Sequence, residues 1–209
     1  KQAGKNPIKF WEKLAKEGIL WEKLWKKTYE ENLPYFKWFS KGKLNFCVNC
    51  LDRHLERNKN KVALVWIPEP PNEKPVKLTY YQLYDSVNRF ANVLKKQGVK
   101  KGDVVSIYLP MIPEALIAML ACARIGAIHS VVFSAFSADA LKARIEDGKS
   151  KVLITADGYY RRGKKENLLS KAEEAVKGTT IKKIIVVNRL GKKISGNNLL
   201  DFNKEMSKT

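Results

Sequence analysis

The stretch Lys151–Lys165, KVLITADGYYRRGKK, organises the interpretation of the whole chain. Its apolar start, Val152–Ile154, predicts a short buried strand of a parallel sheet. The strand breaks at Asp157-Gly158, and the loop that follows carries Arg161, Arg162, Lys164 and Lys165. Open α/β sheets bind ligands at the carboxyl ends of their strands, and clustered cations favour a phosphate. We therefore expect a phosphate-binding loop at one edge of a sheet. A solvated basic loop is the alternative.

Helical and strand patterns alternate on both sides of this stretch. Thr79 and Gln82 form a capping box before a helical pattern that ends at Gly98. Further strands are predicted at 104–109, 127–133 and 183–187, and further helices at 113–125, 137–148 and 167–177. Continuous apolar strands alternating with helices predict an α/β fold, a parallel-rich sheet with helices on both faces. Right-handed crossovers would bring the loops 109–113, 133–137 and 155–165 to one edge.

The first 44 residues are basic and rich in aromatic side chains. Leu14, Trp21, Leu24, Trp25 and Thr28 recur at helical spacing, with breaks near Gly18 and Pro34. This spacing predicts an aromatic-rich, mostly helical N-terminal extension. A helix at 49–57 and a strand at 61–67 follow. We expect the chain to divide into an N-terminal segment, 1–66, and the first part of an α/β domain, 67–209.

The cysteines and histidines do not form a convincing metal site. Cys47 and Cys50 have the spacing of zinc ligands, and His54 follows them, but structural zinc needs four ligands. The remaining His, His129, lies in a predicted strand, where we expect a core histidine, and Cys122 lies in an apolar helix. The pattern therefore favours a helix over a zinc site. No catalytic residue and no metal ligand are predicted.

Composition narrows the partners and the compartment. The 209 residues carry 40 Lys+Arg against 21 Asp+Glu, a net charge of +19 that favours anionic partners. The lysines are spread along the chain, which is typical of a solvated surface. Three dispersed cysteines fit a reducing compartment. No apolar run is long enough for a membrane span, and the N-terminus has no apolar h-region of a signal peptide, so we expect a cytoplasmic protein with no membrane partner.

The segment Gly158–Lys165 nearly matches the phosphate loop G-x-x-x-x-G-K-[ST]. Lys165 stands where the magnesium-binding hydroxyl is needed, and two Tyr and two Arg crowd the interior of the loop. We therefore expect a phosphate clamp made of side chains, and no nucleoside triphosphatase.

Several motifs resemble the adenylate-forming acyl-CoA synthetases, and the acetyl-CoA synthetases in particular. They are Trp38-Phe39, Gly42–Asn45, Asn49–His54, Leu78–Tyr80 with Leu83-Tyr84, Tyr108–Glu114, Met119–Phe133 with Phe136-Ser137, and Thr155–Lys164. The last follows the family pattern T-A-D-x-G-x-R-x-G-K/R, except that the bulkier Tyr159 stands at its first Gly, and together they cover the whole chain. The family joins a carboxylate to ATP as an acyl-adenylate, releases pyrophosphate, and passes the acyl group to coenzyme A.

The resemblance implies roles for two segments. Arg161 and Lys164 match the basic positions that meet the 3′-phosphate end of coenzyme A, and the expected binding loop includes Arg162 and Gly163 between them. Phe133, Ser134 and Ala135 match the segment against which its adenine lies. Ser134-Ala135 departs from the usual Gly-Gly or Ala-Gly of the family, and Lys164 stands where Arg is also found.

The resemblance also implies what this chain lacks. The loop that grips ATP phosphates, the magnesium-binding Glu, the ribose-binding Asp, the carboxylate pocket and the catalytic Lys would follow residue 209. We therefore expect an N-terminal portion that is inactive alone and binds no cofactor tightly. Its partners would be coenzyme A and the remainder of the enzyme, in the same or a separate chain, with ATP and Mg²⁺ acting in the complete enzyme.

Two other functions remain open from the sequence. A basic nucleic-acid-binding module would use the net charge and the aromatic rings, but recognised nucleic-acid motifs are missing, so nucleic acid is disfavoured. A non-catalytic subunit would pair with a separately encoded C-terminal half through an unfinished sheet edge near Val187.

Overall fold

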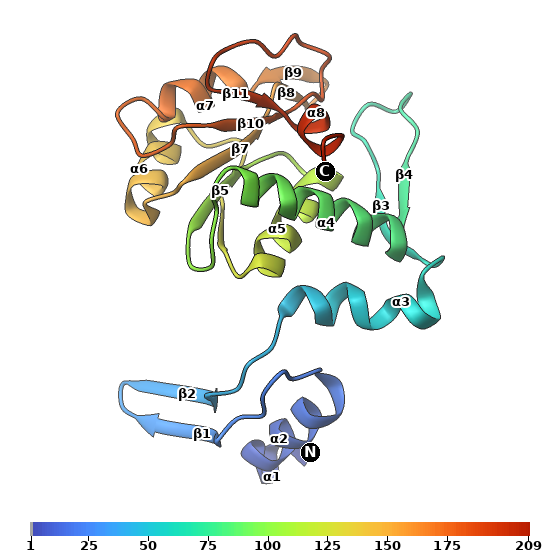
Figure 1. Cartoon of the computed structure of the whole chain (residues 1–209), viewed down its shortest axis with the longest axis vertical. Coiled ribbons are helices and arrows are strands. Elements are labelled where there is room, and N and C mark those ends of the chain that lie inside the picture. The colour runs from blue at the N-terminus through green and yellow to red at the C-terminus, as the bar shows by residue number, and fades with distance from the viewer. Residues whose placement is uncertain (1) are drawn as a thin grey trace. The chain divides into compact units, whose positions relative to one another are not determined.

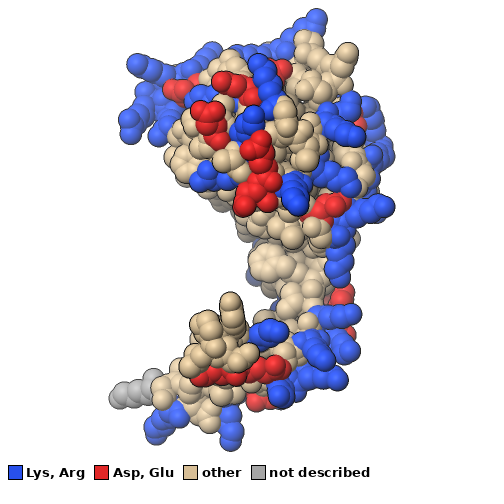
Figure 2. Space-filling view, turned by 90° about the vertical axis from the view of Figure 1, so that its left-hand side faces the viewer, with Lys and Arg blue, Asp and Glu red and all other residues tan. Residues whose placement is uncertain are grey.

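The computed structural model describes residues 2–209, which fall into two compact units. The first unit ends at Arg53, and the second runs from His54 to Thr209. On the face drawn in Figure 2, Lys and Arg are scattered among acidic and uncharged residues in both units. None of the described helices is long and apolar enough to cross a membrane.

The first unit opens with helices and continues into a β-hairpin (Figure 1). Helix α1 spans Gln2–Lys5 and α2 spans Pro7–Gly18. The side-chain oxygen of Asn6 caps α2 by accepting the backbone N–H of Lys9 at 3.0 Å. Strands β1, Lys27–Asn32, and β2, Tyr35–Ser40, then pair antiparallel.

This hairpin corrects the helical prediction for residues 21–28. In the described backbone, helix stops at Gly18 and resumes only at Phe46, and residues 21–26 lead into β1 without forming a helix. Aromatic residues instead face each other across the hairpin: Tyr29 is paired with Trp38, with 4.8 Å between ring centroids. Tyr, Phe and Trp fit a pleated, half-buried surface, so they favoured strands where their spacing favoured a helix.

The aromatic rings of the first unit also form a cluster of Trp21, Trp25 and Phe39. The ring centroids of Trp25 lie 4.9 Å from Trp21 and 4.8 Å from Phe39, in edge-to-face geometry. The Trp21 indole N–H donates to the carbonyl of Ala15 at 2.8 Å, which ties the cluster to α2. These rings therefore supply a small core for the hairpin within the unit.

The segment 48–58 is one helical stretch. It begins as a π-helical turn, Val48–Asp52, and continues as α3, Arg53–Asn58. The helix predicted at 49–57 is thus confirmed.

The second unit begins with a two-stranded sheet and a capped helix. Strands β3, Val62–Trp66, and β4, Val76–Thr79, pair antiparallel. Helix α4, Tyr80–Lys96, has the predicted capping box: Thr79 Oγ1 accepts the Gln82 N–H at 3.2 Å, and Gln82 Oε1 accepts the Thr79 N–H at 2.9 Å.

The rest of the unit contains the predicted alternation, together with strands β8, β9 and β11 and helix α8, which were not predicted. Its elements are β5 Val104–Tyr108, α5 Pro113–Ile125, β6 Ile128–Val131, α6 Ala138–Gly148, β7 Val152–Ala156, β8 Gly158–Arg161, β9 Lys164–Asn167, α7 Leu169–Ala175, β10 Ile184–Val187, β11 Leu199–Asp201 and α8 Phe202–Met206. Five strands form a parallel sheet in the order β11-β10-β7-β5-β6. The predicted α/β class is confirmed.

Helices cover both faces of this sheet (Figure 1). Helix α4 packs on α5 and α8, while α6 packs on α7 against β5 and β7. The strands β7 and β10 are buried along their whole length, which explains their unbroken apolar runs. Phe90 of α4 stacks on Phe202 of α8 with ring centroids 4.6 Å apart, closing one side of the core.

Two predictions about this sheet are wrong. The edge expected near Val187 is covered, because β10 pairs with β11 as well as with β7. The strand β11 has only 3 residues, too few to form a recognisable strand pattern in the sequence. His129 is exposed and is not a core residue, because β6 is an edge strand that pairs with β5 alone among the described strands.

Candidate functional site

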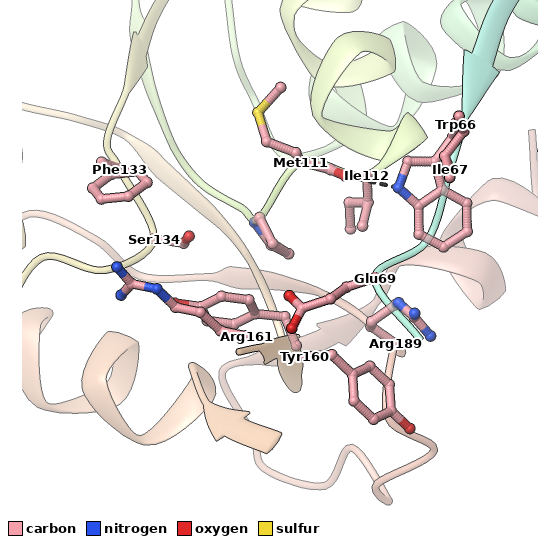
Figure 3. A pocket seen from close by; sticks show the side chains of 12 residues that line it. Trp66, Ile67, Glu69, Met111, Ile112, Phe133, Ser134, Tyr160, Arg161 and Arg189 are labelled. Atoms are coloured by element: carbon pink, nitrogen blue, oxygen red, sulfur yellow. Dashed lines mark hydrogen bonds between the residues drawn. The ribbon is translucent and has the colours of Figure 1, made fainter. Parts of the chain in front are cut away.

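A cavity lies where the strand order of the sheet reverses. The chain passes from β5 to β6 on one side and returns to β7 on the other. The cavity has a volume of about 290 Å³ and lies beyond the carboxyl ends of these strands. The residues that line the cavity lie at the end of one of five strands or in the segment after it (Figure 3). They are Trp66, Ile67 and Glu69 at β3, Pro110, Met111 and Ile112 after β5, Phe133 and Ser134 after β6, Tyr159, Tyr160 and Arg161 after β7, and Arg189 after β10. The predicted meeting of the loops 109–113, 133–137 and 155–165 at one edge of the sheet is confirmed.

The predicted basic loop is a β-hairpin. Strands β8 and β9 pair antiparallel, and Arg162 and Gly163 form the two-residue turn between them. Both have positive φ, 51° and 73°, as a two-residue hairpin turn of type I′ requires. We call Arg161–Lys164 the basic turn. A hairpin replaces the strand–loop–helix of a nucleotide phosphate loop, in agreement with the sequence argument against that motif.

The hairpin leaves the sheet through Asp157 and Gly158. The Asp157 side chain is fully buried, and its carboxylate accepts the backbone N–H groups of Arg189, Leu190 and Lys192 at 2.7–3.0 Å. At Gly158, an added methyl group would meet the carbonyl oxygen of Glu166 and the Leu190 side chain. These two residues therefore fix the segment after β7 against the segment after β10.

The residues predicted to bind coenzyme A come together in part. The guanidinium of Arg161 lies 5.8 Å from the ring centroid of Phe133, which is 58% exposed, and both line the cavity with the buried Ser134. Ala135 is half-buried next to them. The remaining residues of the basic turn, Arg162, Gly163 and Lys164, are exposed and lie outside the cavity lining.

Arg189 lies against this hairpin and was not predicted as a site residue from the sequence. Its guanidinium lies between two rings, 5.1 Å from the centroids of Trp66 and of Tyr160, and pairs with the Glu73 carboxylate at 2.6 Å. Arg189 follows β10 at the same edge of the sheet as the basic turn. The sequence could have indicated Arg189, because it follows a predicted strand and the carboxyl ends of parallel strands lie at one edge of the sheet.

Glu69 was also missed. It lies in the segment 67–75 between β3 and β4, which we call the clamp loop. Its Oε1 accepts the backbone N–H of Gly163 at 2.9 Å, across 94 residues of sequence. No local pattern connects two positions so far apart.

Tyr108 holds the backbone that follows Phe133–Ala135, which we call the aromatic segment. Its hydroxyl donates to the carbonyl of Phe136 at 2.7 Å. Burial raises the pKa of Tyr108 to about 12, and the nearby Tyr159 adds to the rise. The phenol therefore stays protonated at neutral pH and serves as a fixed donor.

A second cavity of about 400 Å³ adjoins the first and shares Trp66, Ile112 and Arg189 with it. Glu114 lines this second cavity, and burial raises the pKa of its carboxyl while Arg189 opposes the rise. Within residues 2–209, no group of three or more His, Cys, Asp or Glu is placed to hold a metal ion. We assign no magnesium ligand to this chain.

Comparison with known proteins identifies the family. Residues 51–205 match the family model of AMP-binding enzymes, and residues 1–50 match that of the acetyl-coenzyme A synthetase N-terminus. An acetyl-coenzyme A synthetase of Methanothrix thermoacetophila is 50% identical over 188 residues, 89% of this chain and 28% of that protein. One from Leptospira biflexa is 52% identical over 196 residues, 91% and 30% of the two proteins.

A solved structure gives the same result. The acetoacetyl-CoA synthetase of Streptomyces lividans superimposes with a TM-score of 0.88 and 26% identity, covering 97% of this chain and 31% of that one. The chain spans less than a third of the length of each of these relatives. The α/β fold, the N-terminal segment and these likenesses together show that the chain belongs to the AMP-binding enzyme family, as an N-terminal part of an acyl-CoA synthetase of the acetyl-CoA synthetase type.

Proposed function

We propose that this chain supplies part of the coenzyme A site of an acetate–CoA ligase. The complete enzyme would convert acetate, ATP and coenzyme A to acetyl-CoA, AMP and pyrophosphate through acetyl-adenylate. The names of the acetyl-coenzyme A synthetases that the chain resembles support this reaction. ATP and Mg²⁺ would act on parts of the enzyme outside these 209 residues.

In this proposal the basic turn meets the 3′-phosphate of coenzyme A. Arg161 and Lys164 would supply charge, and Arg162 and Gly163 would shape the turn. The aromatic segment would support the adenine. The observation that carries the proposal is the 5.8 Å approach of the Arg161 guanidinium to the Phe133 ring at one cavity. A ligand that carries a phosphate beside a planar base can engage both groups together.

Calorimetry with coenzyme A and its 3′-dephospho form tests this role directly. We expect coenzyme A to bind more tightly, because the missing phosphate removes charge-assisted contacts with the basic turn. Equal affinities for the two ligands would remove the role assigned to Arg161 and Lys164.

We also propose that the chain by itself does not form acyl-adenylate, and that it acts together with the remainder of the enzyme, in the same or a separate chain. The charge that develops on the transferred phosphate needs fixed donors and cations, which the resemblance assigns to later segments. Release of pyrophosphate from ATP and acetate by the purified 209-residue chain would overturn this part of the proposal.

A further inference from the structure

We infer that Glu69 and Arg189 are positioning residues, which hold the basic turn in its binding orientation through the clamp loop. The inference rests on the proposed coenzyme A site and adds to it two residues that need not touch the ligand. It follows from three contacts between segments far apart in the sequence, at Gly163, at the Arg189 guanidinium and at Trp66.

The basic turn cannot fix its own orientation. β8 and β9 form a separate two-stranded sheet with four residue pairs, and an isolated hairpin is marginally stable in water. Arg162 adds to the difficulty, because a non-glycine residue at φ 51° adopts a disfavoured backbone conformation. A contact from outside the hairpin is therefore needed to hold the turn.

Glu69 provides that contact at the tip. Its carboxylate accepts the Gly163 N–H at 2.9 Å, on the residue directly between Arg162 and Lys164. Figure 3 shows Glu69 on the cavity wall together with Arg161 and Arg189. A carboxylate so close to a proposed phosphate site would repel an anionic ligand. Its hydrogen bond therefore points to a geometric role that outweighs this repulsion.

Arg189 fixes the base of the same arrangement. Its side chain is 17% exposed and is enclosed by Trp66, by Tyr160 of β8 and by Glu73 of the clamp loop. Its backbone N–H is held by Asp157 at 2.7 Å. The planar guanidinium thus joins the hairpin to the clamp loop by stacking and by an ion pair.

Trp66 anchors the clamp loop to the sheet. Its indole N–H donates to the carbonyl of Met111, which follows β5, at 2.8 Å. The clamp loop is therefore tied to the sheet edge at its start and to the hairpin through Glu69. Its Glu73 pairs with Arg189, whose guanidinium in turn stacks on Tyr160 of the hairpin. This continuous chain of contacts gives the basic turn one position relative to Phe133.

The first test measures the ratio of the dissociation constants of dephospho-coenzyme A and coenzyme A. Glu69→Ala removes the acceptor and should lower this ratio about threefold to tenfold, while Glu69→Gln keeps an acceptor oxygen and should retain it. Arg189→Lys keeps the charge but loses the planar stack, and should lower the ratio as well. Asp147→Ala, at an exposed position of α6, is the control.

An unchanged or higher ratio in Glu69→Ala overturns the inference. Repulsion of the phosphate by the Glu69 carboxylate would then be the only effect of Glu69 on binding. A ratio of one in the wild-type chain would instead remove the proposed coenzyme A role. The inference would then be decided by the second test, which does not need the ligand.

The second test follows the exchange of the Gly163 amide hydrogen by NMR. We expect exchange to quicken about threefold to tenfold in Glu69→Ala relative to the wild type, and to stay near the wild-type rate in Glu69→Gln and Asp147→Ala. Amides of the buried strand β7 should keep their rates in all four proteins, which separates local release from global unfolding. An unchanged Gly163 rate in Glu69→Ala overturns the inference.

Discussion

Both carboxylate oxygens of Asp157 accept the backbone N–H of Leu190 at 3.0 Å, although the two residues lie 33 positions apart. The same carboxylate also accepts the N–H groups of Arg189 and Lys192. One buried side chain thus holds the loop after β10 against the end of β7. It also fixes the backbone of Arg189 directly, beside the cavity.

Replacing Asp157 should destabilise the second unit. Asp157→Ala leaves three partly buried backbone N–H groups without their acceptor, and should cost about 3 kcal/mol. Asp157→Asn keeps one oxygen but brings an NH₂ group against the backbone donors, and should cost about 1–2 kcal/mol. Urea unfolding followed by circular dichroism measures both. Asp147→Ala, at an exposed position, should stay within about 0.5 kcal/mol of the wild type. Equal stability of Asp157→Ala and the wild type would contradict the assigned role.

Gly158 has no room for a side chain. A methyl group would press on the carbonyl of Glu166 and on Leu190, which lie on two different segments. Gly158→Ala should therefore cost about 1–3 kcal/mol, measured by the shift of the urea midpoint. Gly18→Ala is the matched control, because nothing lies within 4 Å of its added methyl group. Small effects of similar size from both substitutions would show that the β8–β9 hairpin can shift to accommodate the added methyl group.

Substitutions at the turn position Arg162 should change stability according to the backbone conformation that the new residue prefers. Its φ of 51° is tolerated by Asn and strongly disfavoured for a β-branched residue. Arg162→Val should therefore destabilise the protein by about 1–2 kcal/mol, while Arg162→Asn should be near neutral. Thermal unfolding of the two variants, which share the same loss of charge, separates the backbone effect from the charge. Identical melting temperatures would argue against the positive φ.

Glu114 should make stability fall as the pH rises. Its pKa is raised in the folded protein by burial, so the folded state binds a proton more tightly than the unfolded state. The free energy of unfolding therefore decreases as the pH rises from the ordinary pKa of glutamate to the raised one. Glu114→Gln should remove this decrease, and its advantage over the wild type should grow with pH across that window. Urea unfolding at several pH values measures it, and a constant difference would contradict the raised pKa.

Arg161 should dominate the phosphate contact in the proposed site. Arg161→Ala should weaken coenzyme A binding about tenfold or more, since a charge-assisted contact is lost, and should affect dephospho-coenzyme A much less. Lys182→Ala removes an exposed cation before β10, at the opposite end of the sheet, and should leave both affinities within about twofold. Equal losses in the two variants would point to general charge attraction, which is also what a nucleic-acid-binding module would show.

The local sequence determined most elements of the second unit, but not β8, β9, β11 or α8. The capping box at Thr79 and Gln82, the buried apolar strands and the glycine stops each depend on residues a few positions apart. Alternation of helix and strand then implied a parallel sheet, and the parallel sheet placed Arg161 and Phe133 at one edge. The motifs in the sequence also indicated the family.

Only the tertiary structure decided the rest. The strand order, the short strand β11, the exposed His129 and the hairpin of the first unit depend on which distant backbones pair. The contact of Glu69 with Gly163 spans 94 residues, and that of Asp157 with Leu190 spans 33. Hydrogen bonds between segments so far apart leave no periodicity in the sequence, because the chain between them can take many lengths and compositions. For that reason the sequence placed cations at the site, while only the fold revealed the carboxylates that hold them.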